Sequence, residues 1–211
     1  MKVLELFAGT RSIGKEFEEL GHEVYSVEWD EKHDNINLYA DISKLTSQDI
    51  LNNFGKPDII WASPDCTSYS IAGISHHRTK EENGNLSPKS DYAKFCDITN
   101  KNVLKLIEEL NPTYYFIENP RGGMRKMNFM QHLNRYTVTY CQYGDTRMKP
   151  TDIWTNHPNP KFKPMCKNGE PCHVSAPRGS ATGTQGLKGS VERSKIPQDL
   201  CKHIVKISEE I

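Results

Sequence analysis

Short apolar segments alternate with helix-like segments along this chain of 211 residues, and that alternation constrains the fold more than any other feature. Val3–Phe7 is apolar with one acid, and a small, glycine-containing stretch follows it as far as Gly14. Residues 15–20 then have a helical pattern that stops at a glycine, and residues 23–27 are strand-like. This β-loop-α-β opening is typical of the start of a doubly wound sheet.

The rest of the chain continues the alternation. Further strands are predicted at 58–62, 114–118 and 136–143, and helices at 97–110 and 198–207. We therefore expect an α/β fold, a doubly wound and mostly parallel sheet with helices on both faces. Two stretches break the pattern. Residues 74–92 are polar and predict a long mobile loop, and residues 155–192 are rich in proline and glycine and predict a small irregular lobe.

Composition and charge exclude some classes of protein. The chain is 36% hydrophobic but has no run of 18 apolar residues, so we expect no membrane partner and a cytoplasmic protein. Residues 1–120 carry 12 basic and 20 acidic groups, a net charge of −8, whereas residues 121–211 carry 15 and 7, a net charge of +8. The basic part could bind a polyanion such as nucleic acid, although ordinary surface variation explains it equally well.

Six cysteines are present without a CxxC pair, and in a chain of this kind we expect thiols rather than disulfides. Cys166, Cys172 and His173 lie close together in the irregular lobe, with His157 nearby. Their spacing matches no standard zinc pattern, so no metal ligand is predicted. Thiols packed within a loop are the simpler interpretation, and a zinc site is the alternative.

Ligands of open α/β sheets bind at the carboxyl ends of the strands, and two polar features lie there near the N-terminus. The glycine-containing loop that starts at Phe7 follows the first strand, and its glycines let the backbone approach a ligand. Glu28 ends the second strand, where an acid can accept the hydroxyls of a ribose, and Trp29 offers a stacking face for a purine. The absence of GxGxxG argues against NAD, and a purely structural glycine turn remains an alternative.

Two further features follow the third and fourth predicted strands. Cys66 comes shortly after residues 58–62 and is either a nucleophile or an inert core thiol. Glu118 and Asn119 come directly after a buried strand and precede a proline, so they form either a catalytic pair or simply a turn.

In order and spacing these segments resemble the DNA (cytosine-5) methyltransferases, particularly a compact, phage-like branch. The resemblance includes a Cys66 loop that continues Tyr-Ser-Ile-Ala-Gly, a Glu-Asn element at 118–119, and residues 142–149 in place of Gln-x-Arg-x-Arg. It implies a Rossmann-like fold and S-adenosylmethionine as cofactor. The cofactor contacts that it implies are Phe7, Ala8, Gly9, Thr10, Arg11, Glu28, Trp29, Asp41, Ile42, Pro64 and Ser194. The catalytic residues that it implies are Cys66, Glu118, Asn119, Arg147 and Lys149.

Several positions depart from the family pattern. Arg11 and Ser12 replace glycines of the cofactor loop, Asp65 stands where a proline is expected, and Thr67 replaces a glutamine. These changes leave the cysteine and the glutamate intact. Arg11 leaves open a variant cofactor with an additional acidic group.

The resemblance also predicts the division of the chain and its partner. Residues 1–154, completed by 186–211, would form the catalytic domain, and residues 155–185 a small target-recognition lobe. The expected partner is double-stranded DNA with the target cytosine flipped out, and the loop 74–92 would close over that base. The alternatives are the same chemistry on RNA or on a nucleotide, and a catalytically silent DNA-binding relative. Methylation of an exocyclic amine is disfavoured because Asp65 and Cys66 follow Ser63-Pro64.

Overall fold

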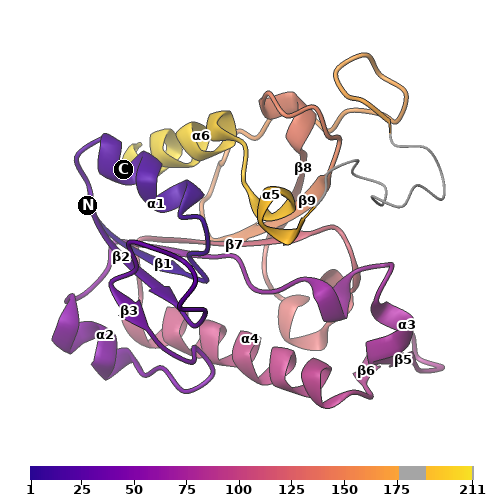
Figure 1. The fold of residues 1–211 in the computed structure, drawn as a ribbon, viewed down its shortest axis with the longest axis horizontal. Coiled ribbons are helices and arrows are strands. Elements are labelled where there is room, and N and C mark those ends of the chain that lie inside the picture. The colour runs from indigo at the N-terminus through magenta and orange to yellow at the C-terminus, as the bar shows by residue number, and fades with distance from the viewer. Residues whose placement is uncertain (176–188, 211) are drawn as a thin grey trace.

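A computed structural model describes residues 1–175 and 189–210, which form a central seven-stranded sheet with helices on both faces (Figure 1). The strand order is β3-β2-β1-β4-β7-β9-β8. The first five run parallel, and β9 is antiparallel to both of its neighbours. The strands of this sheet are β1 Lys2–Leu6, β2 Glu23–Glu28, β3 Leu38–Tyr39, β4 Ile59–Ala62, β7 Tyr114–Pro120, β8 Arg135–Thr139 and β9 Pro150–Thr155. The prediction of a doubly wound, mostly parallel sheet is confirmed.

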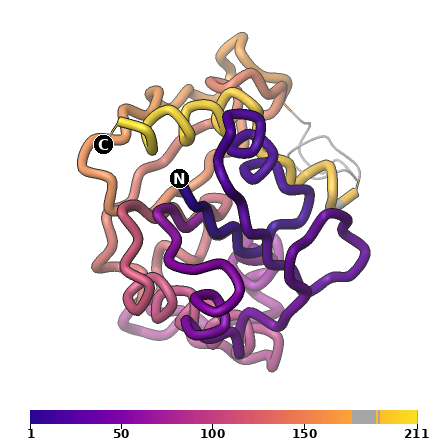
Figure 2. Tube along the Cα trace, turned by 90° about the vertical axis from the view of Figure 1, so that its left-hand side faces the viewer, coloured from indigo at the N-terminus to yellow at the C-terminus, as the bar shows by residue number. Residues whose placement is uncertain are grey.

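Two apolar clusters hold the helices to the sheet. The first and last of the longer helices pack together on one face, where Phe17 and Leu200 belong to the same buried cluster (Figures 1 and 2). On the other face Ile50 and Leu106 belong to a second cluster. The helices are α1 Ser12–Glu19, α2 Ser47–Asn53, α3 Ile74–His77, α4 Asp91–Leu110, α5 Ser190–Ser194 and α6 Gln198–Glu209. Short 3-10 helices are η1 Thr67–Tyr69, η2 Gly123–Lys126, η3 Asn128–Met130 and η4 Tyr140–Tyr143.

The boundaries of several elements differ from the prediction because capping groups outweigh apolar periodicity. Helix α4 begins six residues earlier than expected, since the Ser90 hydroxyl accepts a hydrogen bond from the amide of Ala93. Helix α2, which was not predicted, begins with a capping box between Thr46 and Asp49. The strand predicted at 136–143 ends at Thr139, and the rest of that segment is the 3-10 helix η4.

The prediction of a long mobile loop at 74–92 was wrong. This segment forms α3, a hairpin of β5 (Arg78–Lys80) and β6 (Leu86–Pro88), and the start of α4. Arg78 is buried and anchors the hairpin to η1 and α4. Its Nε donates to the carbonyl of Ser68, and its two Nη atoms donate to the carboxylate of Asp97 at 2.6 and 3.1 Å. Its guanidinium also lies 4.3 Å from the centre of the Tyr69 ring. A polar sequence can therefore be ordered by one buried ion pair.

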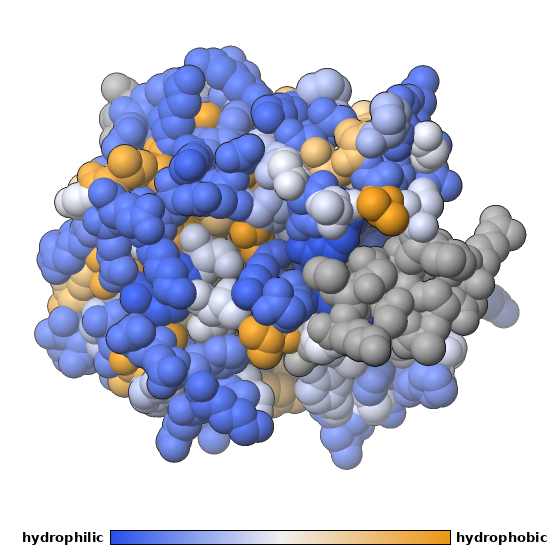
Figure 3. All heavy atoms as spheres, turned by 45° about the horizontal axis from the view of Figure 1, so that its top comes forward, coloured by the Kyte–Doolittle hydropathy of each residue, from blue (hydrophilic) through white to orange (hydrophobic). Residues whose placement is uncertain are grey.

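No helix in the described ranges is long and apolar enough to span a bilayer. The face in Figure 3 is mainly hydrophilic, with small scattered apolar areas. Of the predicted recognition lobe, residues 176–185 lie outside the described residues, as do residues 186–188 and 211 of the predicted C-terminal completion.

The buried ion pair predicts a large stability effect. Arg78→Met should lower the free energy of unfolding by about 3–5 kcal/mol, because it leaves the Asp97 carboxylate buried and unpaired. Lys80→Met, on the exposed part of the same hairpin, should change it by less than about 0.5 kcal/mol. Urea denaturation of both variants measures the difference, and equal midpoints would show that the pair does not hold the hairpin.

Candidate active site

The register of the sheet brings the predicted site residues to one edge. Leu6 of β1 lies opposite Ala62 of β4, and Ala62 lies opposite Ile117 of β7. The strand order also reverses between β1 and β4, which is where open α/β sheets bind ligands. The segments that start at Phe7 and Ser63 therefore leave the sheet beside Glu118, which was expected to follow the strand and lies within the last part of β7.

The loop after β1 has an unusual backbone. Phe7, Gly9 and Arg11 have φ values of 57°, 48° and 57°, in the left-handed region that only glycine adopts easily. A Cβ added to Gly9 would have only the carbonyl oxygen of Phe7 within 4 Å, at 3.9 Å. Backbone held in such conformations is concentrated at ligand sites. Ala8 and Thr10 are the remaining residues of the loop between β1 and α1.

Glu28, the last residue of β2, is hydrogen-bonded to the loop that follows β1. Its buried carboxylate accepts hydrogen bonds from the backbone amides of Gly9, Trp29 and Asp30, at 2.9, 2.9 and 3.1 Å. A carboxylate has about four acceptor positions, so at least one remains for a ligand hydroxyl. Trp29 is 69% exposed, so its ring has a face free for stacking.

The side chain of Arg11 does not face this opening. Its Nε donates to the hydroxyl of Ser26 at 2.8 Å, and its Nη2 donates to Glu18 at 2.5 Å. It also lies 3.7 Å from the buried carboxylate of Glu5, whose pKa burial raises to about 7. The guanidinium group of Arg11 is therefore paired with other residues of the fold, and the backbone of Arg11 is the part that can contact a ligand.

The other predicted cofactor contacts lie in separate segments. Ile42 is buried, and the pKa of Asp41 is lowered by the hydroxyl of Ser43. The carbonyl of Pro64 accepts a hydrogen bond from the Asn119 amide at 2.9 Å. Ser194 is exposed at the end of α5, and its hydroxyl donates to the carbonyl of Val191.

The C-terminal segment returns to the first loop. The amide of Ile196, two residues after α5, contacts the Ser12 hydroxyl at 3.4 Å, and Gln198 contacts Glu16 of α1.

Glu118 is buried at the end of β7. The hydroxyl of Tyr140 donates to its Oε1 at 3.0 Å, and burial raises the pKa of the carboxyl group while the charge of Lys149 opposes that rise. Next to it, Asn119 has a buried Oδ1 without a hydrogen-bond partner among the described residues. The pair thus holds a carboxyl group that retains its proton more readily than usual and an amide that anchors the loop leading to Cys66.

Cys66 lies in the loop after β4, directly before η1. Burial, together with the carboxylates of Asp65 and Glu118, raises the pKa of its thiol to about 11, although the charge of Lys149 opposes the rise. The free protein therefore holds this group as a thiol at neutral pH, and any reaction has to remove its proton or stabilise the thiolate.

The two predicted cations have different roles. The Arg147 guanidinium binds both carboxylate oxygens of Asp145 and donates to the carbonyls of Arg193 and Lys195. Lys149 has a φ of 28°, and its Nζ donates to the Arg193 carbonyl at 2.9 Å. Burial lowers the pKa of Lys149, and its charge acts on both Glu118 and Cys66. Lys149 is therefore the cation of the site, whereas Arg147 fixes the surrounding segments.

Tyr140 is a site residue that sequence reasoning missed. It is fully buried, bonds to Glu118, and has Lys149 Nζ 4.6 Å from its ring centre. Its position in a segment that was predicted to be a strand gave no sign of a polar role. An aromatic residue that carries a hydroxyl within a buried run is the only signal that could have marked it.

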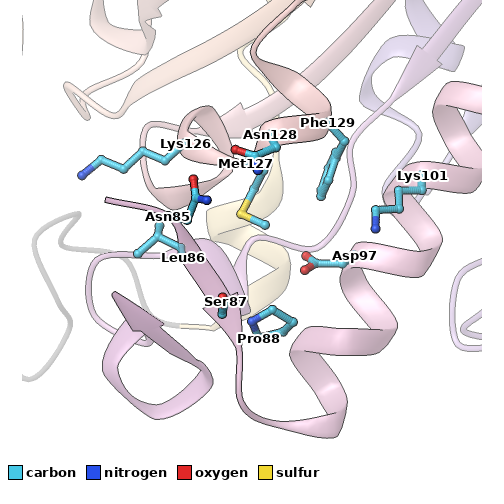
Figure 4. Close-up of a pocket in the computed structure, with 10 residues that line it drawn as sticks. All are labelled: Asn85, Leu86, Ser87, Pro88, Asp97, Lys101, Lys126, Met127, Asn128 and Phe129. Carbon is cyan, nitrogen blue, oxygen red and sulfur yellow. The ribbon is translucent and has the colours of Figure 1, made fainter. Parts of the chain in front are cut away.

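A separate hollow of about 270 Å³ lies between the β5–β6 hairpin, α4 and η3 (Figure 4). Lys101, Lys126 and Asp97 line it, and it includes none of the predicted cofactor or catalytic residues. The hollow is therefore no part of the candidate active site.

A sheet with this strand order, an acid at the end of β2, a cysteine after β4 and a glutamate within β7 define a methyltransferase-like α/β protein. Residues 1–140 match the family described as C-5 cytosine-specific DNA methylase. The match covers well over half of the chain, which therefore belongs to that family. Among curated proteins, none matches the sequence.

Two solved structures support the fold. A DNA modification methyltransferase encoded within an Escherichia coli prophage has a TM-score of 0.52 and 17% identity, over 74% of this chain and 46% of that one. The Entamoeba histolytica methyltransferase EhMeth has a TM-score of 0.53 and 14% identity, over 74% and 52%. The chain thus spans about half the length of these proteins, and the likeness establishes the Rossmann-like methyltransferase fold.

The cofactor of the chain is S-adenosylmethionine. The residues present fit it: Glu28 has spare acceptor capacity for ribose hydroxyls, and Trp29 has an exposed aromatic face. Among the described residues, no side chain other than those of its chain neighbours lies within 4 Å of the position that a Cβ of Gly9 would take. The Arg11 guanidinium is bound to Glu18 and Ser26, so the structure gives no support for a variant cofactor with an additional acidic group.

The raised pKa of Cys66 predicts slow alkylation. At pH 8, iodoacetamide should modify Cys66 about 100-fold more slowly than a cysteine of ordinary pKa, and the rate should rise about tenfold per pH unit up to about pH 10. Lys149→Met should slow the reaction further, because it removes the charge that lowers this pKa, whereas Lys105→Met on exposed α4 should not. Mass spectrometry of the Cys66 peptide measures the rates, and a plateau below pH 9 would contradict the prediction.

Proposed function

We propose that the chain transfers a methyl group to carbon 5 of cytosine in DNA through a covalent adduct with Cys66. The observation that carries the proposal is the mutual electrostatic influence of Cys66, Glu118 and Lys149 at the ends of β4 and β7. A thiol, a proton-retaining carboxyl group and a cation are the three groups that this reaction requires.

Carbon 5 of cytosine is too weak a nucleophile to take a methyl group unaided. The Cys66 thiolate adds to carbon 6 and forms a C–S bond, while Glu118 holds a proton at ring nitrogen 3, so that the ring becomes an enamine. When bound, S-adenosylmethionine supplies the methyl group on a positively charged sulfur. Carbon 5 takes this methyl group from the sulfur, which is thereby left as a neutral thioether. Water then takes the proton from carbon 5, and the electron pair of that C–H bond expels Cys66 as a thiolate, which breaks the C–S bond and restores the aromatic ring.

The surroundings of Glu118 suit this role. Burial favours its protonated form, which can donate to nitrogen 3. The Tyr140 hydroxyl donates to one oxygen and holds the carboxyl group in place. Lys149 stabilises the Cys66 thiolate through its charge and can donate to the ring oxygen of the cytosine.

DNA is the substrate that the family and the basic second part of the chain favour. A base within a duplex cannot reach Glu118 and Cys66, so the cytosine has to be flipped out. The same chemistry on RNA is the second candidate, because the small predicted recognition lobe, residues 155–185, allows it.

The decisive experiment incubates purified protein and S-adenosylmethionine with DNA or with RNA and analyses the nucleosides by mass spectrometry. Wild-type protein should produce 5-methyldeoxycytidine in DNA. Cys66→Ala should lower the product by at least about 10⁴-fold, because the attacking atom is gone. Cys96→Ala, which removes a buried cysteine of α4, should retain most of the activity.

Three outcomes have different meanings. Product in RNA alone would show that the substrate is RNA, and the proposed mechanism would still apply. Undiminished turnover by Cys66→Ala would exclude the covalent adduct. Absence of product in both polymers, with normal cofactor binding, would favour the silent DNA-binding relative.

Cofactor binding can be tested at Trp29. Trp29→Ala should weaken S-adenosylmethionine binding by about 2 kcal/mol, roughly 30-fold in Kd, because it removes the stacking face. Tyr39→Ala, an exposed aromatic residue at the end of β3, is the matched control. Isothermal titration calorimetry gives both constants, and an equal Kd for wild type and Trp29→Ala would exclude the proposed contact.

A further inference from the structure

Three thiols and one imidazole from two distant segments come together beside η4. Cys141 belongs to η4, and Cys166, Cys172 and His173 follow the end of β9. Their four possible ligand atoms all lie within 4.8 Å of one another. We propose that these residues form a Cys3His site for a structural Zn²⁺ ion.

The distances are close to those of a tetrahedral site. With Zn–S of about 2.3 Å and Zn–N of about 2.0–2.1 Å, a tetrahedron places sulfur and nitrogen about 3.6 Å apart and two sulfurs about 3.7 Å apart. His173 Nδ1 lies 3.7 Å from the sulfurs of both Cys166 and Cys172. The sulfurs of Cys141 and Cys166 are 3.0 Å apart, so they would separate by about 0.7 Å around the ion.

The donor set selects the metal. Cys3His is one of the common structural zinc sets, whereas magnesium and calcium require oxygen ligands. No carboxylate belongs to the cluster. The ring of His173 directs Nδ1 at the sulfurs, and its other nitrogen, Nε2, is buried without a hydrogen-bond partner among the described residues.

The polypeptide around the cluster needs such a connection. Residues 164–175, which carry three of the four ligands, contain no helix or strand, and few hydrogen bonds attach this range to the domain. Examples are the Cys166 amide to the Thr139 hydroxyl at 3.0 Å and the Val174 amide to the Thr146 carbonyl at 2.8 Å. An ion bound by Cys141 and by the three ligands of this segment would fix it to η4.

The location gives the site a function within the molecule. Thr146 accepts from Val174 and lies directly before Arg147, whose guanidinium holds the C-terminal segment. Zinc would therefore hold the beginning of the predicted recognition lobe at a fixed position relative to Lys149. The ion takes no part in the chemistry, and the inference does not depend on the proposed reaction.

His157, which the sequence placed near these residues, is used elsewhere. Its Nε2 contacts the carbonyl of Ile207, and its Nδ1 accepts from the amide of Asn159. Cys141 takes the fourth position instead. The sequence interpretation of thiols packed within a loop could not include Cys141, because it lies 25 residues before the next ligand.

The test measures metal in the intact protein. Protein expressed with zinc in the medium and purified without chelator should contain about one zinc per chain by inductively coupled plasma mass spectrometry. Cys172→Ser and His173→Ala should lose most of this zinc, and substitution of Co²⁺ should give the intense visible absorption of tetrahedral thiolate coordination. Cys172 is exposed, so its replacement leaves the core intact, which circular dichroism verifies.

Matched controls separate this site from adventitious metal. Cys96→Ser and His132→Ala remove one cysteine and one histidine outside the cluster and should keep the full zinc content. Zinc that is absent from the wild type even after anaerobic purification with zinc supplied would overturn the proposal. So would zinc that is equal in all five proteins, or a Cys141–Cys166 disulfide found in the protein purified in this way.

Discussion

The two-sided pairing of β7 is the constraint on which the site depends. β7 pairs in parallel with β4 as far as Ile117 and antiparallel with β9 as far as Pro120. Glu118 lies opposite Ile153 and Asn119 opposite Asp152. The β9 ladder therefore continues along Glu118 and holds its backbone at a buried position. Because burial raises the pKa of the Glu118 carboxyl group, the raised pKa depends on the pairing of β7.

Buried polar groups around the site connect segments that are separate in the sequence. Asn119 reaches across to the carbonyl of Pro64, Tyr140 reaches Glu118, and Arg78 joins the hairpin to the η1 segment. Each of these bonds replaces water at a group that would be costly to bury alone. The Cys66 loop is therefore held from both sides, by β7 through Pro64 and by the hairpin through Ser68. A loop held in this way offers its thiol at a fixed position, which is what a nucleophile requires.

The sequence predicted the sheet, and the structure brings most of the candidate site residues to one edge of it, because both depend on local patterns. Apolar runs located β1, β4 and β7, and the ends of parallel strands necessarily share one edge, so Glu28, Cys66 and Glu118 could be expected to lie near one another. What it could not predict depends on contacts between distant residues. The polar segment 74–92 is ordered by a pair between Arg78 and Asp97, 19 residues apart, and no local periodicity indicates that pair. The bond from Tyr140 to Glu118 likewise exists only once β7 and η4 are in place.

Lys149 is where the separate parts of the protein meet. Its charge acts on Cys66 after β4 and on Glu118 of β7, and its Nζ donates to the Arg193 carbonyl of the C-terminal segment. Arg147 donates to the same carbonyl, and the residue before Arg147 receives the bond from Val174. A displacement of either the C-terminal segment or the irregular segment before residue 175 would therefore move the cation of the site. Since electrostatic energy varies inversely with distance, even a small movement would change the pKa of both reacting groups. The C-terminal segment, the irregular segment before residue 175, and the pair formed by Cys66 and Glu118 are therefore all coupled to Lys149. A structural change in any of these three parts would alter the electrostatic interactions of Lys149.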